Sequence, residues 1–276
     1  MPKTILLLIF VWLMSLNAQE IRFAPLPKEK VETLEKEYKP FLKWLSRQTG
    51  DTYTLVVSVD YNDLADKIKK GEVDIAYLGP LPYAIVKQHT DSIVPILKFL
   101  DKNGNSAYTC SIIARKDSGI KSVKELKNKK ISLTQKYSTC GYYNAKIAFD
   151  KEKTNLSGYS FDGTHSNVAL NVITGESDGG SLQTAYFDKY QYLGLTKIYE
   201  SEPLPGFLLA ANKNRLNEEK IAKIKKLIIK LSPLSNAKDK EITSSWSEGI
   251  RYGAVEAKEQ EYAQIVKNFK EMAALK

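Results

Sequence analysis

Short apolar segments alternate with amphipathic segments along almost the whole chain, which leaves few fold classes open. The amphipathic segments carry apolar residues at helical spacing, as in Val31, Leu34 and Tyr38. The short apolar segments predict strands at residues 21–24, 53–59, 73–78, 93–99, 108–115, 131–134, 159–161, 178–182 and 207–211. This alternation is typical of α/β proteins in which helices cover both faces of parallel sheets.

The first residues have the three zones of a secretory signal peptide. Lys3 precedes an apolar stretch at residues 5–14, and the short segment Ser15-Leu16-Asn17-Ala18 follows it. A membrane-spanning helix needs roughly 20 apolar residues, and this stretch is about half as long. We therefore predict that residues 1–18 are a signal peptide and that the mature protein is secreted to the periplasm. Because Leu16 is an unusual residue near such a cut, a cleavage site one or two residues away stays open.

Basic residues outnumber acidic ones, with 41 Lys and Arg against 32 Asp and Glu and a formal net charge of +9. A basic chain is attracted to nucleic acids and to anionic membranes. Here, however, lysines alternate with glutamates, as in Lys28-Glu29-Lys30, which is typical of a solvated helix surface. Because export also removes the protein from nucleic acid, we predict no nucleic-acid partner.

The chain lacks the common catalytic and cofactor motifs. It has no Gly-x-Ser-x-Gly, His-Glu-x-x-His or Gly-x-x-x-x-Gly-Lys segment, and no dinucleotide-binding glycine pattern. Its two histidines and two cysteines cannot readily build a zinc site without carboxylates. We therefore predict no catalytic residue, no metal and no cofactor.

The two cysteines, Cys110 and Cys140, leave two interpretations open. In an oxidising compartment an even number of cysteines permits one disulfide. Alternatively, one is a buried apolar residue and the other an unpaired thiol, which would be reactive at a helix N-terminus. The second interpretation keeps open an enzyme in which Cys140 and His165 act as nucleophile and base.

Two polar junctions mark places where a predicted strand is followed by a predicted helix. One is Ser138-Thr139-Cys140-Gly141, and the other is Gly163-Thr164-His165-Ser166-Asn167. The first amides of a helix lack intrahelical acceptors and carry partial positive charge, so an oxyanion fits there. An ordinary Ser or Thr helix cap is the alternative at either junction. Because both junctions occur in one half of the chain, we predict a shared oxyanion site.

Five segments, in order along the chain, resemble the periplasmic phosphate-, phosphite- and phosphonate-binding components of ABC importers. They are SVDYNDLADKIKKGEVDIAYLGPLPY, SIIARKDSGIKSVKELKNKKISLT, YSTCGY, GTHSNVALNVITGESDGG and GAVEAKEQEYAQI. The resemblance implies an α/β fold of the type II periplasmic binding protein class, with two α/β lobes and a two-strand hinge. It divides the chain into lobe 1, residues 19–107 plus 207–276, and lobe 2, residues 108–206.

The resemblance also implies a ligand site between the lobes. Ser138, Thr139 and the backbone amide of Cys140 would cradle an oxyanion, and His165 would donate to the same group. Tyrosine hydroxyls and a wall from lobe 1 would complete the site. The predicted members are Tyr61, Gly79, Pro80, Leu81, Tyr108, Ser138, Thr139, Cys140, His165 and Gln183.

Two positions depart from the family pattern. Cys140 occupies a position at which the family usually has a third side-chain hydroxyl. This chain therefore lacks that hydroxyl donor but keeps the backbone amide. Gln183 occupies the position at which relatives that hold an aminoalkylphosphonate or a protonated ligand oxygen carry a carboxylate. A neutral amide cannot pair with an ammonium group, which disfavours 2-aminoethylphosphonate and leaves the native oxyanion open.

The predicted function is capture of a phosphonate, phosphite or phosphate oxyanion by lobe closure, followed by delivery to an ABC permease in the inner membrane. We expect the protein to be a monomer. Closure would occur at a hinge near residues 107–110 and 204–207. One alternative is a binding protein that reports to a chemoreceptor or sensor kinase. The other is an enzyme on the same fold that uses Cys140 and His165.

Overall fold

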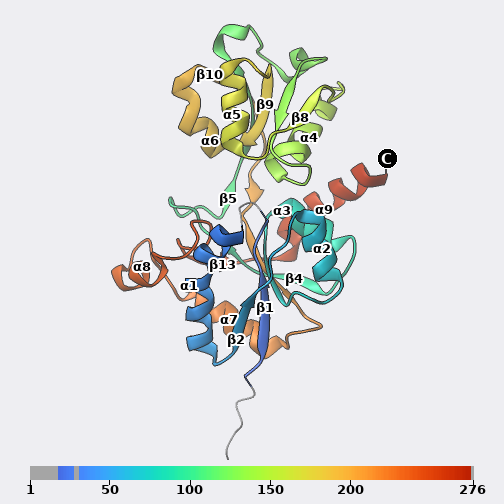
Figure 1. Ribbon diagram of the computed structural model, residues 1–276. Helices are drawn as coiled ribbons and strands as arrows, with labels where there is room; N and C mark the ends of the chain where they lie inside the picture. The colour runs from blue at the N-terminus through green and yellow to red at the C-terminus, as the bar shows by residue number, and fades with distance from the viewer. Residues whose placement is uncertain (1–17, 28–30, 275–276) are drawn as a thin grey trace, which may run out of the picture.

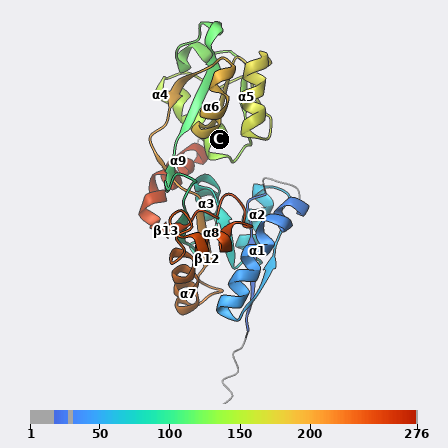
Figure 2. The same ribbon diagram turned by 90° about the vertical axis from the view of Figure 1, so that its left-hand side faces the viewer.

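The computed structural model describes residues 18–27 and 31–274 of the chain, which form two lobes (Figures 1 and 2). Residues 1–17 of the predicted signal peptide lie outside the described residues. Each lobe is built on its own sheet with helices packed on both faces. Because the strands divide between these two sheets, we propose that the first lobe consists of residues 19–107 plus 207–276, and the second lobe of residues 108–206.

The first lobe contains a six-stranded sheet, which buries the larger hydrophobic core. Strand β3 is buried along its whole length, as expected for a central strand covered on both faces. The strand order is β13 (Ala254–Glu256), β4 (Ile93–Phe99), β12 (Leu208–Asn212), β3 (Ile75–Leu78), β1 (Glu20–Ala24) and β2 (Thr52–Leu55). The helices of this lobe are α1 (Val31–Thr49), α2 (Tyr61–Lys69), α3 (Pro80–Lys87), α7 (Glu218–Ile229), α8 (Ala237–Thr243) and α9 (Glu259–Ala274).

The second lobe contains a five-stranded sheet with an apolar cluster on each face. Its strand order is β10 (Leu195–Glu200), β6 (Cys110–Arg115), β9 (Gly179–Gln183), β7 (Ile131–Leu133) and β8 (Tyr159–Phe161). Its α-helices are α4 (Asn144–Lys151), α5 (His165–Thr174) and α6 (Thr184–Tyr190). Shorter helical turns are η1 (Lys116–Ser118), η2 (Val123–Leu126), η3 (Thr139–Tyr143) and η4 (Gln191–Leu193).

Strand β9 is rich in glycine because helix α5 packs directly against its backbone. A Cβ atom on Gly180 would lie 2.6 Å from the Cγ1 atom of Val168 on α5. No larger residue therefore fits at this position without moving the helix. The close approach matters for the site, because His165 is the first residue of α5.

The two lobes are joined by a short antiparallel pair of strands, β5 (Ala107–Tyr108) and β11 (Leu204–Pro205). Thr109 separates β5 from β6, so the single strand expected over residues 108–115 is divided between the hinge and the second lobe. Tyr108 is opposite Leu204 in the hinge. The predicted fold class, with two α/β lobes and a two-strand hinge, is confirmed.

The expectation of purely parallel sheets is wrong, because both sheets are mixed. Strand β12 runs antiparallel to β3 and β4, and β6 runs antiparallel to β9 and β10. These are the strands that follow the two crossings between the lobes. A strand that enters a sheet from the other lobe has no crossover helix in its own lobe to impose a parallel direction.

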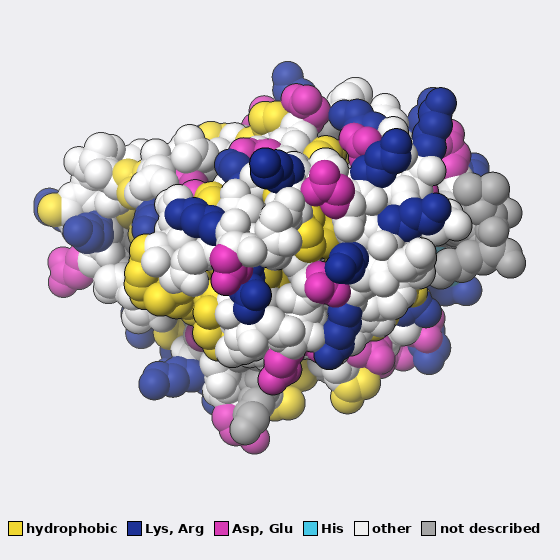
Figure 3. All heavy atoms as spheres, turned by 90° about the horizontal axis from the view of Figure 1, so that it is seen from above, with side chains coloured by type: hydrophobic (Ala, Val, Ile, Leu, Met, Phe, Trp, Pro, Cys, Tyr) yellow, Lys and Arg dark blue, Asp and Glu magenta, His cyan; other side chains and the backbone are white. Residues whose placement is uncertain are grey.

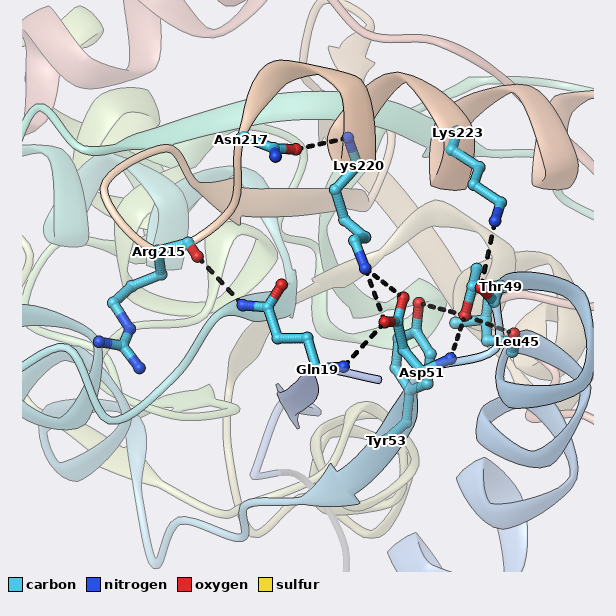
Figure 4. A network of polar contacts seen from close by, with 9 residues as sticks. All are labelled: Gln19, Leu45, Thr49, Asp51, Tyr53, Arg215, Asn217, Lys220 and Lys223. Carbon is cyan, nitrogen blue, oxygen red and sulfur yellow. Dashed lines mark hydrogen bonds and ion pairs between the residues drawn. The ribbon is translucent and has the colours of Figure 1, made fainter. Parts of the chain in front are cut away.

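A buried carboxylate holds the N-terminal end of the first lobe together (Figure 4). Asp51 accepts hydrogen bonds from the Nζ atom of Lys220 at 2.6 and 2.7 Å and from the backbone N–H of Gln19 at 3.1 Å. Burial alone would raise the pKa of Asp51, but these donors lower it below its usual range. The contacts join the entry to β1, the start of β2 and helix α7.

The charged surface is mixed rather than uniformly basic. Seen from above, Lys and Arg side chains lie among Asp and Glu side chains (Figure 3). In the second lobe Lys146 pairs with Asp150, and Lys197 pairs with Glu200. Among the described residues on the face drawn, basic side chains do not gather into one continuous patch.

Candidate functional site

The first predicted helix start is an irregular turn, η3, that follows strand β7 and leads into α4. Thr139 and Cys140 are buried in it, and Ser138 precedes it without using its hydroxyl as a helix cap. Gly141 has φ −91° and ψ −110°, outside the helical region. A Cβ atom at Gly141 would lie 2.3 Å from Oγ1 of Thr134, so only glycine fits. The Gly141 N–H donates to the Ser138 carbonyl at 3.3 Å, whereas the first amides of a helical turn, here those of Thr139 and Cys140, have no acceptor within the turn.

The open question about the cysteines is answered by a disulfide between Cys110 and Cys140, with a Cα–Cα distance of 5.0 Å. Both cysteines of the chain are used in it. Disulfide sulfurs carry no thiolate, so the alternative in which Cys140 is a nucleophile lacks its reactive group. The side chain of Cys140 therefore forms a covalent link between η3 and β6.

The second predicted helix start lies at the N-terminus of α5. Thr164 is an ordinary cap, since its Oγ1 atom accepts from the Asn167 N–H at 3.1 Å. The next residue, His165, is half-buried, and its Nδ1 atom accepts from the backbone N–H of Gln183 at 3.2 Å. Because Nδ1 accepts, the proton of the neutral imidazole is on Nε2. The ring of Tyr186 lies 4.9 Å from the imidazole, between centroids.

The two helix starts are attached to the same end of the paired strands β6 and β9. Cys110 is directly opposite Gln183 in this pair. Cys140 is bonded to Cys110, and His165 accepts from the Gln183 amide. In addition, the Oγ atom of Ser181 donates to the Cys140 carbonyl at 2.7 Å. The structure thus brings Cys140, His165 and Gln183 together through adjacent strand residues.

The predicted wall from the first lobe contacts this cradle directly. Gly79 ends the turn after β3 and precedes α3, with Pro80 as its first residue. The backbone N–H of Leu81 donates to Oγ1 of Thr139 at 3.1 Å, and both residues are buried. This hydrogen bond crosses from one lobe to the other. It leaves the hydroxyl proton of Thr139 available for another acceptor.

Two tyrosine hydroxyls of the predicted site, those of Tyr108 and Tyr61, lie near one another, and that of Tyr108 is next to Thr139. Tyr108 lies in the hinge and stacks on Phe207 at a centroid distance of 5.5 Å. Its buried hydroxyl lies next to Thr139 but has no well-formed hydrogen bond to any described residue. Burial raises the pKa of Tyr108 well above its usual value and that of Tyr61 to about 12. Both phenols therefore stay protonated at neutral pH and can donate to an anion.

Three neighbours of the site were not among the predicted site residues. Phe207 packs between Tyr108 and Tyr77, with centroid distances of 5.5 and 5.8 Å. Ser181 supports the Cys140 carbonyl from a glycine-rich strand. Asn268 on α9 donates to the Tyr143 hydroxyl at 3.0 Å, a second hydrogen bond between the lobes. None of these residues lies in a recognisable motif, since each acts through a contact distant in sequence.

The described residues hold neither a metal cluster nor a membrane-spanning segment. Within residues 18–27 and 31–274, three or more His, Cys, Asp or Glu side chains are nowhere grouped to bind a metal ion. Among the same residues, no helix combines the length and the apolar composition that a membrane crossing requires.

Sequence comparison finds a family described as "ABC transporter, phosphonate, periplasmic substrate-binding protein", whose model matches residues 23–262. A phosphate-import protein of Mycolicibacterium smegmatis, PhnD, is 26% identical over 254 residues, which cover 85% of this chain and 76% of that protein. The phosphonates-binding periplasmic protein of Escherichia coli is 24% identical over 208 residues, covering 70% of this chain and 61% of that protein.

Structural comparison finds the same fold. PhnD1 from Prochlorococcus marinus, solved in complex with methylphosphonate, superposes with a TM-score of 0.75 at 16% identity. The match covers 92% of this chain and 98% of that chain. A binding protein component of an ABC phosphonate transporter from Pseudomonas aeruginosa gives a TM-score of 0.72 at 21% identity, covering 92% and 87% of the two chains.

Proposed function

This chain belongs to the periplasmic substrate-binding proteins of phosphonate ABC transporters, and we propose that it captures a phosphonate, phosphite or phosphate oxyanion for an ABC permease. The observation that carries this proposal is the attachment of two helix starts to one end of the β6–β9 pair, through Cys140 and His165. Two helix starts at one end of adjacent strands favour a small anion with several oxygens.

The donors around this place suit a tetrahedral anion. Thr139 and His165 offer a hydroxyl and an imidazole N–H from the second lobe, next to the amide of Cys140. Tyr108 offers a buried phenol from the hinge, and Tyr61 a phenol from the first lobe. Hydrogen bonds to a charged acceptor are roughly twice as strong as neutral ones. Micromolar affinity requires about 8 kcal/mol, which several such bonds can supply.

The proposed mechanism is binding by lobe closure, without a covalent step. The oxyanion would bind first to the helix starts of the second lobe. Rotation at β5 and β11 would then bring the wall at Leu81 against Thr139, which excludes water and strengthens the hydrogen bonds to the anion. The permease would recognise the closed arrangement of both lobes.

Several narrower expectations belong to the same proposal. We propose that the protein binds without catalysing a reaction, because its relatives are named as import and binding proteins and the Cys140 thiol is consumed in a disulfide. We propose export with cleavage after Ala18, and a monomeric mature protein. Ser138, Gly79, Pro80 and Gln183 complete the proposed lining of the site.

Calorimetric titration of the mature protein with an oxyanion panel tests this function. The panel contains phosphate, phosphite, methylphosphonate and 2-aminoethylphosphonate, with methanesulfonate as the control. Methanesulfonate has the shape of methylphosphonate but only a single charge and no P–OH group. We expect at least one phosphorus oxyanion to bind with micromolar or tighter Kd and methanesulfonate to bind far more weakly. Binding of none of the phosphorus oxyanions would refute the proposal.

A further inference from the structure

The Cys110–Cys140 disulfide lies where the hinge meets the proposed oxyanion cradle. Cys110 is the first residue of β6, one residue beyond Thr109, which follows the hinge strand β5. Cys140 is the second residue of η3. Both are buried, with 0% and 3% of their surface exposed. The covalent bond therefore connects a strand that leaves the hinge to the turn whose amides face the proposed ligand.

The turn needs such external support because its own hydrogen bonds hold it poorly. It is a single π-helical turn, and Gly141 within it departs from helical geometry. The Cys140 peptide is instead held by two neighbouring strands. From β9, Ser181 Oγ donates to the Cys140 carbonyl at 2.7 Å, and Asn144 Nδ2 in turn donates to Ser181 Oγ at 3.0 Å. From β6, Cys110 holds the Cys140 side chain.

Strands β6 and β9 also hold the other helix start. Gln183, opposite Cys110, donates its backbone N–H to Nδ1 of His165. The disulfide thus sets the position of Cys140 relative to the strand residue that orients His165. Without it, the Cys140 peptide is still held by the hydrogen bond from Ser181, and the segments before the two helix starts by the bond from the Gly163 N–H to the Thr134 carbonyl at 2.9 Å, but the covalent link to β6 is lost.

We propose that the Cys110–Cys140 disulfide is a positioning element of the oxyanion site, so that affinity for the ligand depends on its formation. This inference rests on the proposed function. Pre-organised donors bind an anion without first being ordered, and a loosened turn adds that ordering cost to the binding equilibrium. An oxidising compartment keeps the bond formed.

The main test variant is Cys110→Ala, which breaks the disulfide without changing any donor of the cradle. Ser201→Ala is the matched control, because the Ser201 hydroxyl accepts from the Cys110 backbone N–H at 3.0 Å and its loss leaves the disulfide intact. The calorimetric titrations use whichever panel oxyanion the unmodified protein binds. They are run at a temperature well below the melting temperatures of all the proteins compared. We expect Cys110→Ala to lose about tenfold in affinity, the cost of ordering one loosened segment, and Ser201→Ala to stay within about twofold.

A second measurement uses the unmodified chain. Dithiothreitol cleaves the S–S bond, giving two cysteine thiols and the cyclic disulfide of the reagent, and thiol titration confirms the reaction. The reduced protein should show the same affinity loss as Cys110→Ala. Without ligand, hydrogen exchange of the peptide covering residues 138–143 should be about tenfold faster after reduction, while a peptide from α9 is unchanged.

The outcomes separate the inference from the function on which it rests. If the reduced protein or Cys110→Ala binds within twofold of the oxidised protein and differs from it only in a lower melting temperature, the disulfide only stabilises the second lobe. That result would overturn the inference. Unchanged exchange at residues 138–143 would overturn it as well, whether or not any ligand binds. If the oxidised protein binds no oxyanion, the proposed function fails, and the exchange experiment still decides whether the disulfide orders the turn.

Discussion

Replacing Thr139 with valine removes a single polar atom at the point where the two lobes meet. Oγ1 of Thr139 accepts a hydrogen bond from the Leu81 N–H at 3.1 Å. Thr139 is 6% exposed and Leu81 is 1% exposed, so water does not reach this bond. Valine has nearly the same shape as threonine, and the substitution therefore deletes the hydroxyl while keeping the packing.

The expected loss of affinity follows from this burial. In the closed Thr139→Val protein the Leu81 N–H is buried without an acceptor, which costs about 1–3 kcal/mol. In an open protein the same amide is exposed to water, so the cost falls on closure and hence on ligand binding. Because 1.4 kcal/mol corresponds to a tenfold change, we expect Kd to rise roughly 5- to 150-fold.

The assay is calorimetric titration of the unmodified protein, Thr139→Val and Thr139→Ser with the same oxyanion. The serine variant keeps the hydroxyl and loses only a methyl group, so its Kd should stay within about fourfold of the unmodified value, since a buried methyl contributes about 0.8 kcal/mol. If Thr139→Val binds within twofold of the unmodified protein, the lobes do not close through this bond and the reasoning is wrong. Equal losses in both variants would assign the effect to the methyl group instead.

Three other predictions concern the second helix start, the irregular turn and the base of the first lobe. His165→Ala should weaken oxyanion binding about tenfold through loss of one charge-assisted donor, with little change in the melting temperature of the free protein; calorimetry and thermal unfolding check this. Gly141→Ala should destabilise the protein by about 1–3 kcal/mol in urea unfolding, because the new methyl group collides with Thr134, and unchanged stability would contradict this crowding. The pKa of Asp51 is lowered in the folded state, because Lys220 and backbone donors outweigh its burial. Its stabilising contribution is therefore present above its unfolded pKa of about 3.9 and is lost as pH falls through the lower folded value. Asp51→Asn should lower the free energy of unfolding at pH 7, and this free energy should then fall less steeply as the pH is lowered. Urea unfolding at several pH values checks this, and an unchanged pH profile would contradict the contribution of this carboxylate.

The positions of the helix starts were predictable from local sequence. A cluster of small polar residues between a β-branched run and an apolar periodic run predicts a helix N-terminus, and η3 and α5 begin at Thr139 and His165. The predicted strand over residues 73–78 likewise ends directly before Gly79 and Pro80, where α3 begins. Each of these features depends on side chains within a few residues of one another.

The supports of the site were not predictable in this way. Ser181 is a serine in a glycine-rich strand, and only its position next to η3 makes its hydroxyl a donor to the Cys140 carbonyl. Phe207 falls within the predicted hinge range of residues 204–207, but its stacking on Tyr108 is a contact that only the fold creates. The antiparallel entry of β6 and β12 into their sheets likewise depends on the two crossings between the lobes.

The sequence by itself determined the α/β class and the chemical character of the helix starts, because backbone preference, periodicity and side-chain donors are properties of neighbouring residues. The two lobes were expected only through the resemblance to a known family. The tertiary structure alone decided that Cys110 pairs with Cys140 and that Leu81 bonds to Thr139. Both contacts join segments that meet only after the strands have paired and the lobes have packed, and the free energy that selects them comes from burial over the whole fold rather than from any local pattern.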